Sequence, residues 1–278
     1  MSELEQWVGR TQQSHDVITL GGVKRFCATT GVDFNSSDTT TAPLGYHWCL
    51  CLPDNPMSEL GVDGHPLKGD FLPPIELPRR MWAASNVEFF GVLPIGAEVT
   101  RFSTIASVKE KSGKTGALVF VDVEHETHIN NHCVIKETQT IVYREATTAP
   151  MPLPDIVAEK VAEQKKDWPI SKEILPTTAM LFRYSALTFN SHRIHYDRVY
   201  AIEQESYPEL VVHGPLMATL VLQLAGAHHN LKTFSYRSVS PAFCNQVLTM
   251  AAKFNNHDGE LTMIGADGRT CLTATVEF

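Results

Sequence analysis

The feature that most constrains the fold of this chain is a pattern that occurs twice along its 278 residues. In each half, segments with helical signals precede segments rich in Val, Thr, Ile and Phe, which favour β-strands. The β-rich segments are residues 99–109, 117–127 and 132–144 in the first half and 234–239, 246–254, 261–266 and 270–278 in the second. Asp258-Gly259 and Asp267-Gly268 separate the last three and are strong hairpin signals. The pattern predicts a duplicated unit of helices followed by an antiparallel sheet.

The helices expected from the sequence lie ahead of each sheet. Residues 1–52 carry helical signals, and the mostly apolar stretch 44–52 is expected to be a buried helix. In the second half, residues 181–188 are expected to form a strand that turns into helix-compatible stretches at 192–204 and 215–229. The last stretch is apolar on nearly all sides, so we expect the sheet to enclose it.

Two proline-containing segments interrupt the pattern. Residues 53–80 are rich in Pro and Gly, and a loop of that length is usually a functional lid or partly disordered. Residues 146–176 contain five prolines around a charged stretch that suits one amphipathic helix, and we interpret them as an interdomain linker. The expected division is a first domain at 1–148, a linker at 149–176 and a second domain at 177–278.

Charge and composition limit the partners of the chain. It has 23 basic and 31 acidic residues and no Lys/Arg cluster beyond two pairs, which argues against nucleic acid. No apolar run approaches the roughly 18 residues of a spanning helix, which argues against a membrane. The N-terminal residues match neither a secretory nor a transit pattern, so a cytoplasmic location is expected. Six scattered cysteines without a C-x-x-C pair indicate reduced, buried thiols.

Residues 181–217 carry the strongest functional signal in the sequence. His195 and Asn190 lie near the predicted turn, and Gly214-Pro215 follows an apolar run in the manner of a helix start. An imidazole moves protons near neutral pH, and the N-terminus of a helix can hold a negatively charged oxygen. The two features together predict a catalytic site.

Two blocks of the sequence resemble a known family. The block from Phe182 to Asp197, followed by the block from Tyr207 to Leu216, resembles the hydratase signature of MaoC-like, double-hotdog acyl-thioester dehydratases. Residues 77–83 and 108–113 are similar to the non-catalytic N-terminal hotdog of those proteins. The resemblance implies an α+β fold with two hotdogs in one chain, each an antiparallel sheet wrapped around a central helix.

The resemblance also implies an activity, which is reversible addition of water across the α,β double bond of an acyl-CoA without metal or organic cofactor. Within the family, the chain most resembles the itaconyl-CoA and mesaconyl-C4-CoA hydratases and the mitochondrial 3-hydroxyacyl-thioester dehydratases. The missing transit pattern favours the first group, and hence a short C5-dicarboxylyl-CoA substrate. A fatty-acid 3-hydroxyacyl-thioester dehydratase, a hotdog thioesterase and a non-catalytic acyl-CoA-binding subunit are the alternatives. The expected partner is an acyl-CoA thioester, and a homodimer is left open.

The resemblance assigns three catalytic positions. His195 takes the proton-transfer role. Asn190 stands where the (R)-specific hydratases usually have Asp, and because an amide is no base near neutral pH we expect it to orient water or substrate. The N–H of Gly214 is expected to stabilise the thioester oxygen, with a turn glycine as the alternative.

Further polar residues are candidates for substrate binding. They are Arg183, Arg193, His213 and Tyr184. A guanidinium suits a carboxylate or the CoA phosphates, but a structural ion pair is the alternative for both arginines. His125, His128 and His132 do not predict a zinc site, because the first two face opposite sides of a strand and the third lies beyond a turn.

Overall fold

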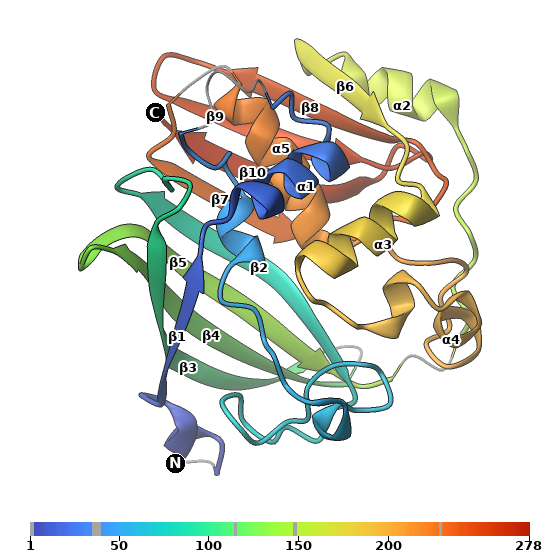
Figure 1. Ribbon diagram of the computed structural model, residues 1–278. Coiled ribbons are helices and arrows are strands. Elements are labelled where there is room, and N and C mark those ends of the chain that lie inside the picture. The colour runs from blue at the N-terminus through green and yellow to red at the C-terminus, as the bar shows by residue number, and fades with distance from the viewer. Residues whose placement is uncertain (1–2, 35–39, 114–115, 147–148, 228–229) are drawn as a thin grey trace.

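Ten strands form the frame of the protein (Figure 1). The computed structural model describes residues 3–34, 40–113, 116–146, 149–227 and 230–278. The strands of the first half are β1 (Thr11–Val17), β2 (Arg79–Phe89), β3 (Glu98–Gly113), β4 (Gly116–Ile129) and β5 (His132–Arg144). Those of the second half are β6 (Ile170–Ile174), β7 (Thr233–Ser238), β8 (Leu248–Phe254), β9 (Asp258–Ile264) and β10 (Thr270–Glu277).

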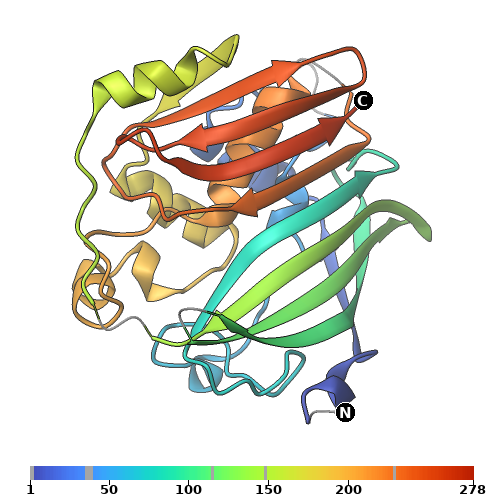
Figure 2. The same ribbon diagram turned by 180° about the vertical axis from the view of Figure 1, so that it is seen from behind.

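The strands belong to one antiparallel sheet in which the two halves mirror each other. The order is β1-β3-β4-β5-β2-β7-β10-β9-β8-β6. Counted from its outer edge toward the middle of the sheet, each half therefore places its strands in the same order, which is first, third, fourth, fifth and second. The half-sheets join where β2 pairs with β7, which Figure 2 shows from behind. In this pair Ala84 lies opposite Arg237. The duplication predicted from the sequence is confirmed. Strand β6 begins the second copy and pairs with β8, although it falls inside the segment expected to be a linker.

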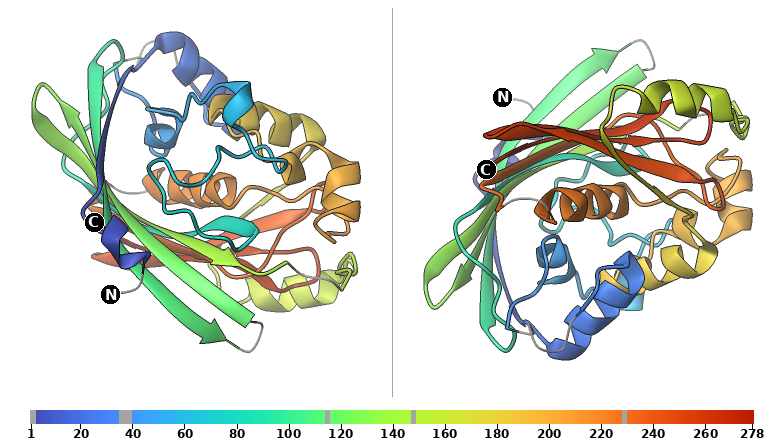
Figure 3. Two further views of the ribbon diagram at one scale, coloured as in Figure 1. Left: turned by 90° about the horizontal axis from the view of Figure 1, so that it is seen from below. Right: turned by 90° about the horizontal axis from the view of Figure 1, so that it is seen from above.

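Helices cover one face of the second half-sheet, and the helix over residues 158–165 lies on the opposite face (Figure 3). The α-helices are α1 (Leu20–Thr30), α2 (Ala158–Lys165), α3 (Thr178–Leu187), α4 (Arg198–Glu203) and α5 (Gly214–Gly226), and the 3₁₀ helices are η1 (Glu5–Trp7), η2 (Tyr46–Cys49), η3 (Met57–Glu59) and η4 (Arg193–His195). Helix α5 packs on β2 and β7–β10, and α1 and α3 lie on the same side (Figure 3). Eight residues of α5 are buried, as expected for an enclosed helix, whereas α1 packs mainly against α3.

The prediction of a strand over residues 181–188 is wrong, because residues 181–187 belong to α3. The Thr177 hydroxyl accepts a hydrogen bond from the Met180 N–H (3.2 Å) and caps the helix. The buried residues Leu181 and Tyr184 are three positions apart, which is a helical spacing. A short apolar run does not distinguish helix from strand by periodicity alone, and the cap was the signal that decides it.

The described part of residues 1–52 contains one strand and less helix than expected. Strand β1 pairs with β3 at an edge of the sheet, with Thr11 opposite Thr104. The buried helix expected over 44–52 is limited to the four residues of η2, because Leu50 is already in extended conformation. Runs of 3₁₀ helix are short because their hydrogen bonds are poorly aligned.

The Pro/Gly-rich segment 53–80 is ordered along its length. Ile75 is buried in a second apolar cluster with Val121 and Tyr143 of the first half-sheet. Lys68 Nζ donates to the carbonyl oxygens of Ile75 (2.8 Å) and Leu77 (2.6 Å). The packing of Ile75 holds the segment against the first half-sheet, and the Lys68 hydrogen bonds fix the segment's own fold. Within the described ranges, no helix is both long and apolar enough to cross a membrane.

Candidate active site

His195 lies at the end of η4 and is buried. Its Nδ1 is 2.7 Å from the Val211 carbonyl oxygen, and because a carbonyl only accepts, Nδ1 carries the proton. Burial lowers the pKa of His195 to about 4, against the opposing effect of the Val211 carbonyl. The ring is therefore neutral near pH 7 and its Nε2 has a lone pair, which is the form that accepts a proton.

A second buried histidine stacks on the first. The rings of His213 and His195 are 3.6 Å apart between centroids, at an interplanar angle of 18°. His213 Nε2 is 2.9 Å from Ser185 Oγ, whereas its Nδ1 is buried and has no hydrogen-bond partner among the described residues. Burial, followed by the charge of His195, holds the pKa of His213 well below its ordinary value. A buried polar atom without a hydrogen-bond partner is energetically costly. The Nδ1 atom is therefore available to form a hydrogen bond with a bound molecule.

Helix α5 begins beside these rings. His213 occupies its N-cap position without a side-chain cap, and Gly214 is its first residue. The first N–H groups of a helix have no partner within it, and the helix dipole makes them attractive to an anion. A Cβ at Gly214 would lie 3.0 Å from Ser238 Oγ, which is itself buried without a partner in the described structure. The sequence-predicted His195, His213 and Gly214 are thus brought together.

Two other predicted residues shape the walls of this site. Asn190 Oδ1 accepts a hydrogen bond from the backbone N–H of His192 (3.0 Å), an Asx-type turn ahead of η4. The Tyr184 hydroxyl is 3.2 Å from Thr219 Oγ1, and its ring packs edge-on against His213 at 5.1 Å. The roles assigned to Asn190 and Tyr184 in substrate positioning stay predictions.

The two predicted arginines lie apart from His195. Arg193 binds Asp197 Oδ2 through Nη2 (2.8 Å) and stacks over Tyr200, so the alternative of a structural ion pair is confirmed for it. Arg183 is exposed on α3 and lines a cavity of about 500 Å³ between α1 and α3. Since that cavity does not include His195, the structure does not bring Arg183 to the site, and substrate binding by either arginine stays a prediction.

Comparison with known proteins decides the family. The model of the family "hydroxyacyl-thioester dehydratase type 2" matches residues 45–244. This chain belongs to the hydroxyacyl-thioester dehydratase type 2 family. It is 42% identical over 277 residues to a mesaconyl-C4-CoA hydratase of Chloroflexus aurantiacus, an alignment that covers 98% of this chain and 96% of the relative.

Solved structures establish the fold of this family member. A MaoC-like dehydratase superimposes with a TM-score of 0.76 at 14% identity, covering 99% of this chain and 98% of that one. A Mycobacterium tuberculosis protein described as a double hotdog has a TM-score of 0.59 at 13% identity, covering 97% and 95%. At such identities the likeness concerns fold alone, and it confirms the expected α+β double hotdog.

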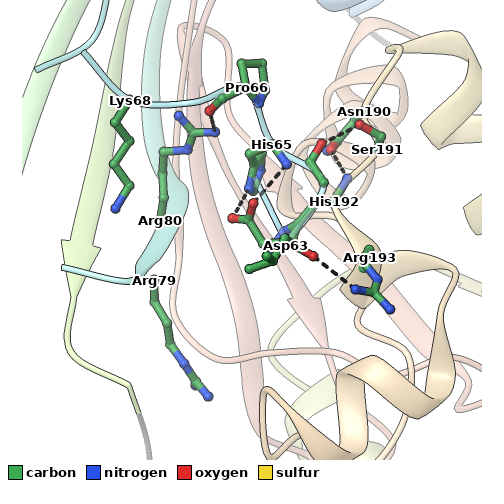
Figure 4. A network of polar contacts seen from close by, with 12 residues as sticks. Asp63, His65, Pro66, Lys68, Arg79, Arg80, Asn190, Ser191, His192 and Arg193 are labelled. Atoms are coloured by element: carbon green, nitrogen blue, oxygen red, sulfur yellow. Dashed lines mark hydrogen bonds and ion pairs between the residues drawn. The ribbon is translucent and has the colours of Figure 1, made fainter. Parts of the chain in front are cut away.

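Sequence reasoning missed three polar residues that lie beside the candidate site. Figure 4 shows Asp63 and His65, from the Pro/Gly-rich segment, facing His192 of the turn before η4. The rings of His65 and His192 are 4.1 Å apart, and His192 meets His195 edge-on at 5.4 Å. The available signal was the prediction that segment 53–80 is functional, together with the position of His192 inside the signature block.

Among the residues that the structure describes, two groups of side chains have the spacing of metal ligands. Asp63, His65 and His192 form one, and their ligand atoms lie within 4.8 Å of one another. The other is formed by Glu126, His128 and Cys133. His128 Nε2 pairs with Glu126 at 3.2 Å.

Proposed function

We propose that this protein is an acyl-CoA hydratase, a hydro-lyase that adds or removes water across the α,β double bond of a short enoyl-CoA. The observation that carries the proposal is the neutral His195 ring, with a free Nε2, beside the uncapped start of α5. We infer a C5-dicarboxylyl-CoA substrate, such as mesaconyl-C4-CoA or itaconyl-CoA, because the 42% identical relative is a mesaconyl-C4-CoA hydratase.

The proposed step uses groups of this chain alone. His195 Nε2 takes a proton from water while the water oxygen bonds to the β carbon. The π electrons move toward the α carbon and the thioester oxygen, where the N–H of Gly214 stabilises the growing negative charge. The α carbon then takes the proton from His195, which restores the neutral ring. Asn190 holds the turn that presents His195.

In the same proposal the halves divide the work. Residues 177–278, with β6 at their outer edge, form the catalytic domain, and residues 1–148 form a non-catalytic domain that completes the acyl-CoA site. The contact between β2 of the first half and the start of α5 supports this division. The Trp82 carbonyl oxygen of β2 lies 3.6 Å from the position that a Cβ atom would take at Gly214. A cytoplasmic location and a homodimer are also part of the proposal. Light scattering of the purified protein tests the homodimer, and a measured mass of one chain would contradict it.

Assays with purified protein test the proposal. Mesaconyl-C4-CoA, itaconyl-CoA and a linear enoyl-CoA are each incubated with it, and formation of hydroxyacyl-CoA is followed by chromatography. We expect hydration of the dicarboxylyl esters. A folded protein that hydrates none of the three would contradict the proposal, and release of free CoA thiol would indicate a thioesterase.

A second candidate follows from the family description, which is that of a hydroxyacyl-thioester dehydratase. Such an enzyme would act in fatty-acid metabolism on linear acyl chains. The same assay separates the two, because this candidate predicts faster turnover as the linear chain lengthens.

A further inference from the structure

An arginine, a lysine and a tyrosine of the first half converge, and we call them the Arg80 cluster: Lys68, Arg80 and Tyr143. Arg80 of β2 lies directly opposite Tyr143 of β5, so the two side chains project from the same face of the sheet. Lys68, from the Pro/Gly-rich segment, places its Nζ over the Tyr143 ring, 5.7 Å from the centroid. Arg80 and Lys68 are half-buried and Tyr143 is fully buried. The cluster thus gathers two positive charges and a phenol.

The two cations of the Arg80 cluster have no acidic partner of their own. Lys68 Nζ donates to the carbonyl oxygens of Ile75 (2.8 Å) and Leu77 (2.6 Å), which uses two of its three protons. Arg80 Nη2 donates to the Pro66 carbonyl oxygen at a long 3.4 Å. In the part of the chain that the structure describes, neither side chain forms an ion pair. A half-buried charge is costly without a partner of opposite sign.

The Tyr143 hydroxyl adds a buried donor to the cluster. Its oxygen is shielded from solvent and has no hydrogen-bond partner among the described residues. Burial raises the pKa of Tyr143, and the charge of the neighbouring Arg80 opposes this. Because a guanidinium only donates, the proton of the phenol still requires an acceptor. The cluster therefore offers donors from three side chains to a group that carries acceptor oxygens.

The carboxylate of Asp63 acts on the cluster but is engaged elsewhere. Its charge raises the pKa of Lys68, although burial and the charge of Arg80 keep that pKa below its ordinary value. Asp63 Oδ2 lies 2.9 Å from His65 Nδ1, and Asp63 Oδ1 accepts from the His65 N–H (3.0 Å). Two cations thus meet one carboxylate that is already hydrogen-bonded, and a further anion would balance the charge.

The segment that carries Lys68 is fastened to the turn before η4. The Ser191 hydroxyl donates to the Gly64 carbonyl oxygen, and the Arg193 N–H donates to the Asp63 carbonyl oxygen (2.9 Å). Gly64 has a φ of 87°, and a Cβ there would sit 1.9 Å from the Ser191 carbonyl oxygen. Glycine permits so close an approach, so the position of the cluster relative to the candidate site is closely defined.

The Arg80 cluster adjoins the candidate active site through the residues that Figure 4 shows. Pro66, which Arg80 contacts, follows His65 in the chain, and the His65 ring lies 4.1 Å from that of His192. The His192 ring in turn lies 5.4 Å from that of His195. Two ring-to-ring steps therefore separate the neighbour of the cluster from the proposed base, a span within the length of one CoA thioester.

The chemistry of the cluster selects an anion with acceptor oxygens. A guanidinium binds both oxygens of a carboxylate, an ammonium adds a point charge, and a phenol donates one hydrogen bond. We propose that the Arg80 cluster is an anion subsite of the enzyme and that it holds the free carboxylate of a dicarboxylyl-CoA substrate. The inference rests on the hydratase function proposed above and names the residues that select the acyl group. A phosphate of CoA is the other substrate anion with this chemistry, and the experiments separate the two.

Arg80→Gln tests the inference by a comparison of two enoyl esters. Mesaconyl-C4-CoA carries a carboxylate on the β carbon, whereas but-2-enoyl-CoA carries a methyl group there and no carboxylate. We expect kcat/KM to fall about 30-fold for the first ester, the effect of losing a charge-assisted pair of hydrogen bonds, and by less than about 2-fold for the second. Arg237→Gln, at an exposed position of β7, is the matched control and is expected to change neither.

Binding of saturated esters tests the same subsite without turnover. Succinyl-CoA has a carboxylate where butanoyl-CoA has a methyl group, and neither takes up water. Titration calorimetry is expected to show that succinyl-CoA binds wild-type protein about 30-fold more tightly than butanoyl-CoA, and that this preference disappears in Arg80→Gln. Equal affinity of the two esters for the wild type would overturn the inference.

Two conservative variants separate recognition from a structural role. Tyr143→Phe is expected to lower the preference for succinyl-CoA about 5-fold without lowering the thermal midpoint, because the deleted hydroxyl has no partner in the described structure. Arg80→Lys keeps the charge but loses the planar fork, and it is expected to keep part of the preference. A lowered thermal midpoint in both variants with an unchanged preference would show a structural role and overturn the inference.

The outcomes also distinguish this inference from the function beneath it. Wild-type protein that hydrates neither enoyl ester would contradict the proposed function, whereas the calorimetry would still decide the subsite. If Arg80→Gln lost activity equally on both enoyl esters and affinity equally for both saturated esters, the cluster would bind a CoA phosphate, and the assignment to the acyl carboxylate would be wrong.

Discussion

Helices α1 and α5 both lie between the first and the second strand of their respective halves, yet their N-termini differ. At α1 the Thr19 hydroxyl accepts from the Gly22 N–H (3.1 Å) and closes the end of the helix. At α5 the N-cap residue His213 makes no side-chain cap, and Gly214 leaves the first N–H groups open. The duplicated frame is thus shared, and in the proposed function the chemistry belongs to the copy whose helix end is left unsatisfied.

The largest effect on this comparison is expected when the proposed base, His195, is removed from beside the N-terminus of α5. We expect His195→Ala to lower kcat by 10²-fold or more, on the order of a general base's contribution, with the fold intact by circular dichroism. His128→Ala in the first half is the control and is expected to leave kcat within about 2-fold. Wild-type-like turnover of His195→Ala would contradict the assignment.

Acidification tests a property that the two halves share. The pKa of His195 is lowered to about 4 by burial and that of His47, in the first half, to about 3 by burial and Arg101. In the unfolded chain these rings take up protons first, so stability is greatest above about pH 6.5 and falls as pH decreases toward the folded values. The share of His195 is about 3 kcal/mol.

Unfolding by urea at a series of pH values measures this dependence. His195→Gln and His47→Gln are each expected to flatten it, whereas only His195→Gln is expected to lower kcat. If the free energy of unfolding of His195→Gln depended on pH as steeply as that of the wild type, the assignment of His195 as a buried, neutral ring would be wrong.

Gly214→Ala sharpens the comparison at the open helix end. The added methyl would meet Ser238 Oγ at 3.0 Å and would keep a thioester oxygen away from the N–H. We expect kcat to fall about 10-fold, an intermediate loss for one weakened oxyanion contact, while thermal stability changes little. Full activity with a normal thermal midpoint would favour the turn-glycine alternative.

Thr19→Ala is the matched change at the closed helix end and has the smallest effect. Loss of the cap is expected to lower the free energy of unfolding by about 1 kcal/mol without altering kcat. Urea unfolding and the hydration assay on the same preparation measure both quantities. A loss of kcat comparable with that of Gly214→Ala would remove the distinction between the two helix ends.

Much of the fold was accessible from the sequence, because strands and hairpins are marked by local chemistry. The segments predicted as strands in both halves are strands, and Asp258-Gly259 and Asp267-Gly268 lie where the last three approach one another. Strand β1 was not recognised, since a short strand at a sheet edge is defined by its neighbour in the sheet. Helix α3 was not recognised, since a short apolar run does not distinguish helix from strand by periodicity alone. Strand β6 likewise became visible only through its pairing with β8.

The site was predictable where its residues are close in sequence. His195, His213 and Gly214 come together as expected. Asp63 and His65 could not be assigned, because their approach to His192 depends on Gly64 and on a hydrogen bond from the Ser191 hydroxyl, 127 positions away. Arg193 illustrates the converse, since the ion pair that was its structural alternative is formed with Asp197, only four residues away.

The central claim is that the acyl group lies between His195 and the start of α5. A crystal structure of the wild-type protein with a saturated acyl-CoA, which cannot take up water, tests it most directly. We predict a thioester oxygen about 2.7–3.1 Å from the Gly214 nitrogen, with the β carbon facing His195 Nε2. An acyl chain held in the cavity between α1 and α3, away from both groups, would contradict the account.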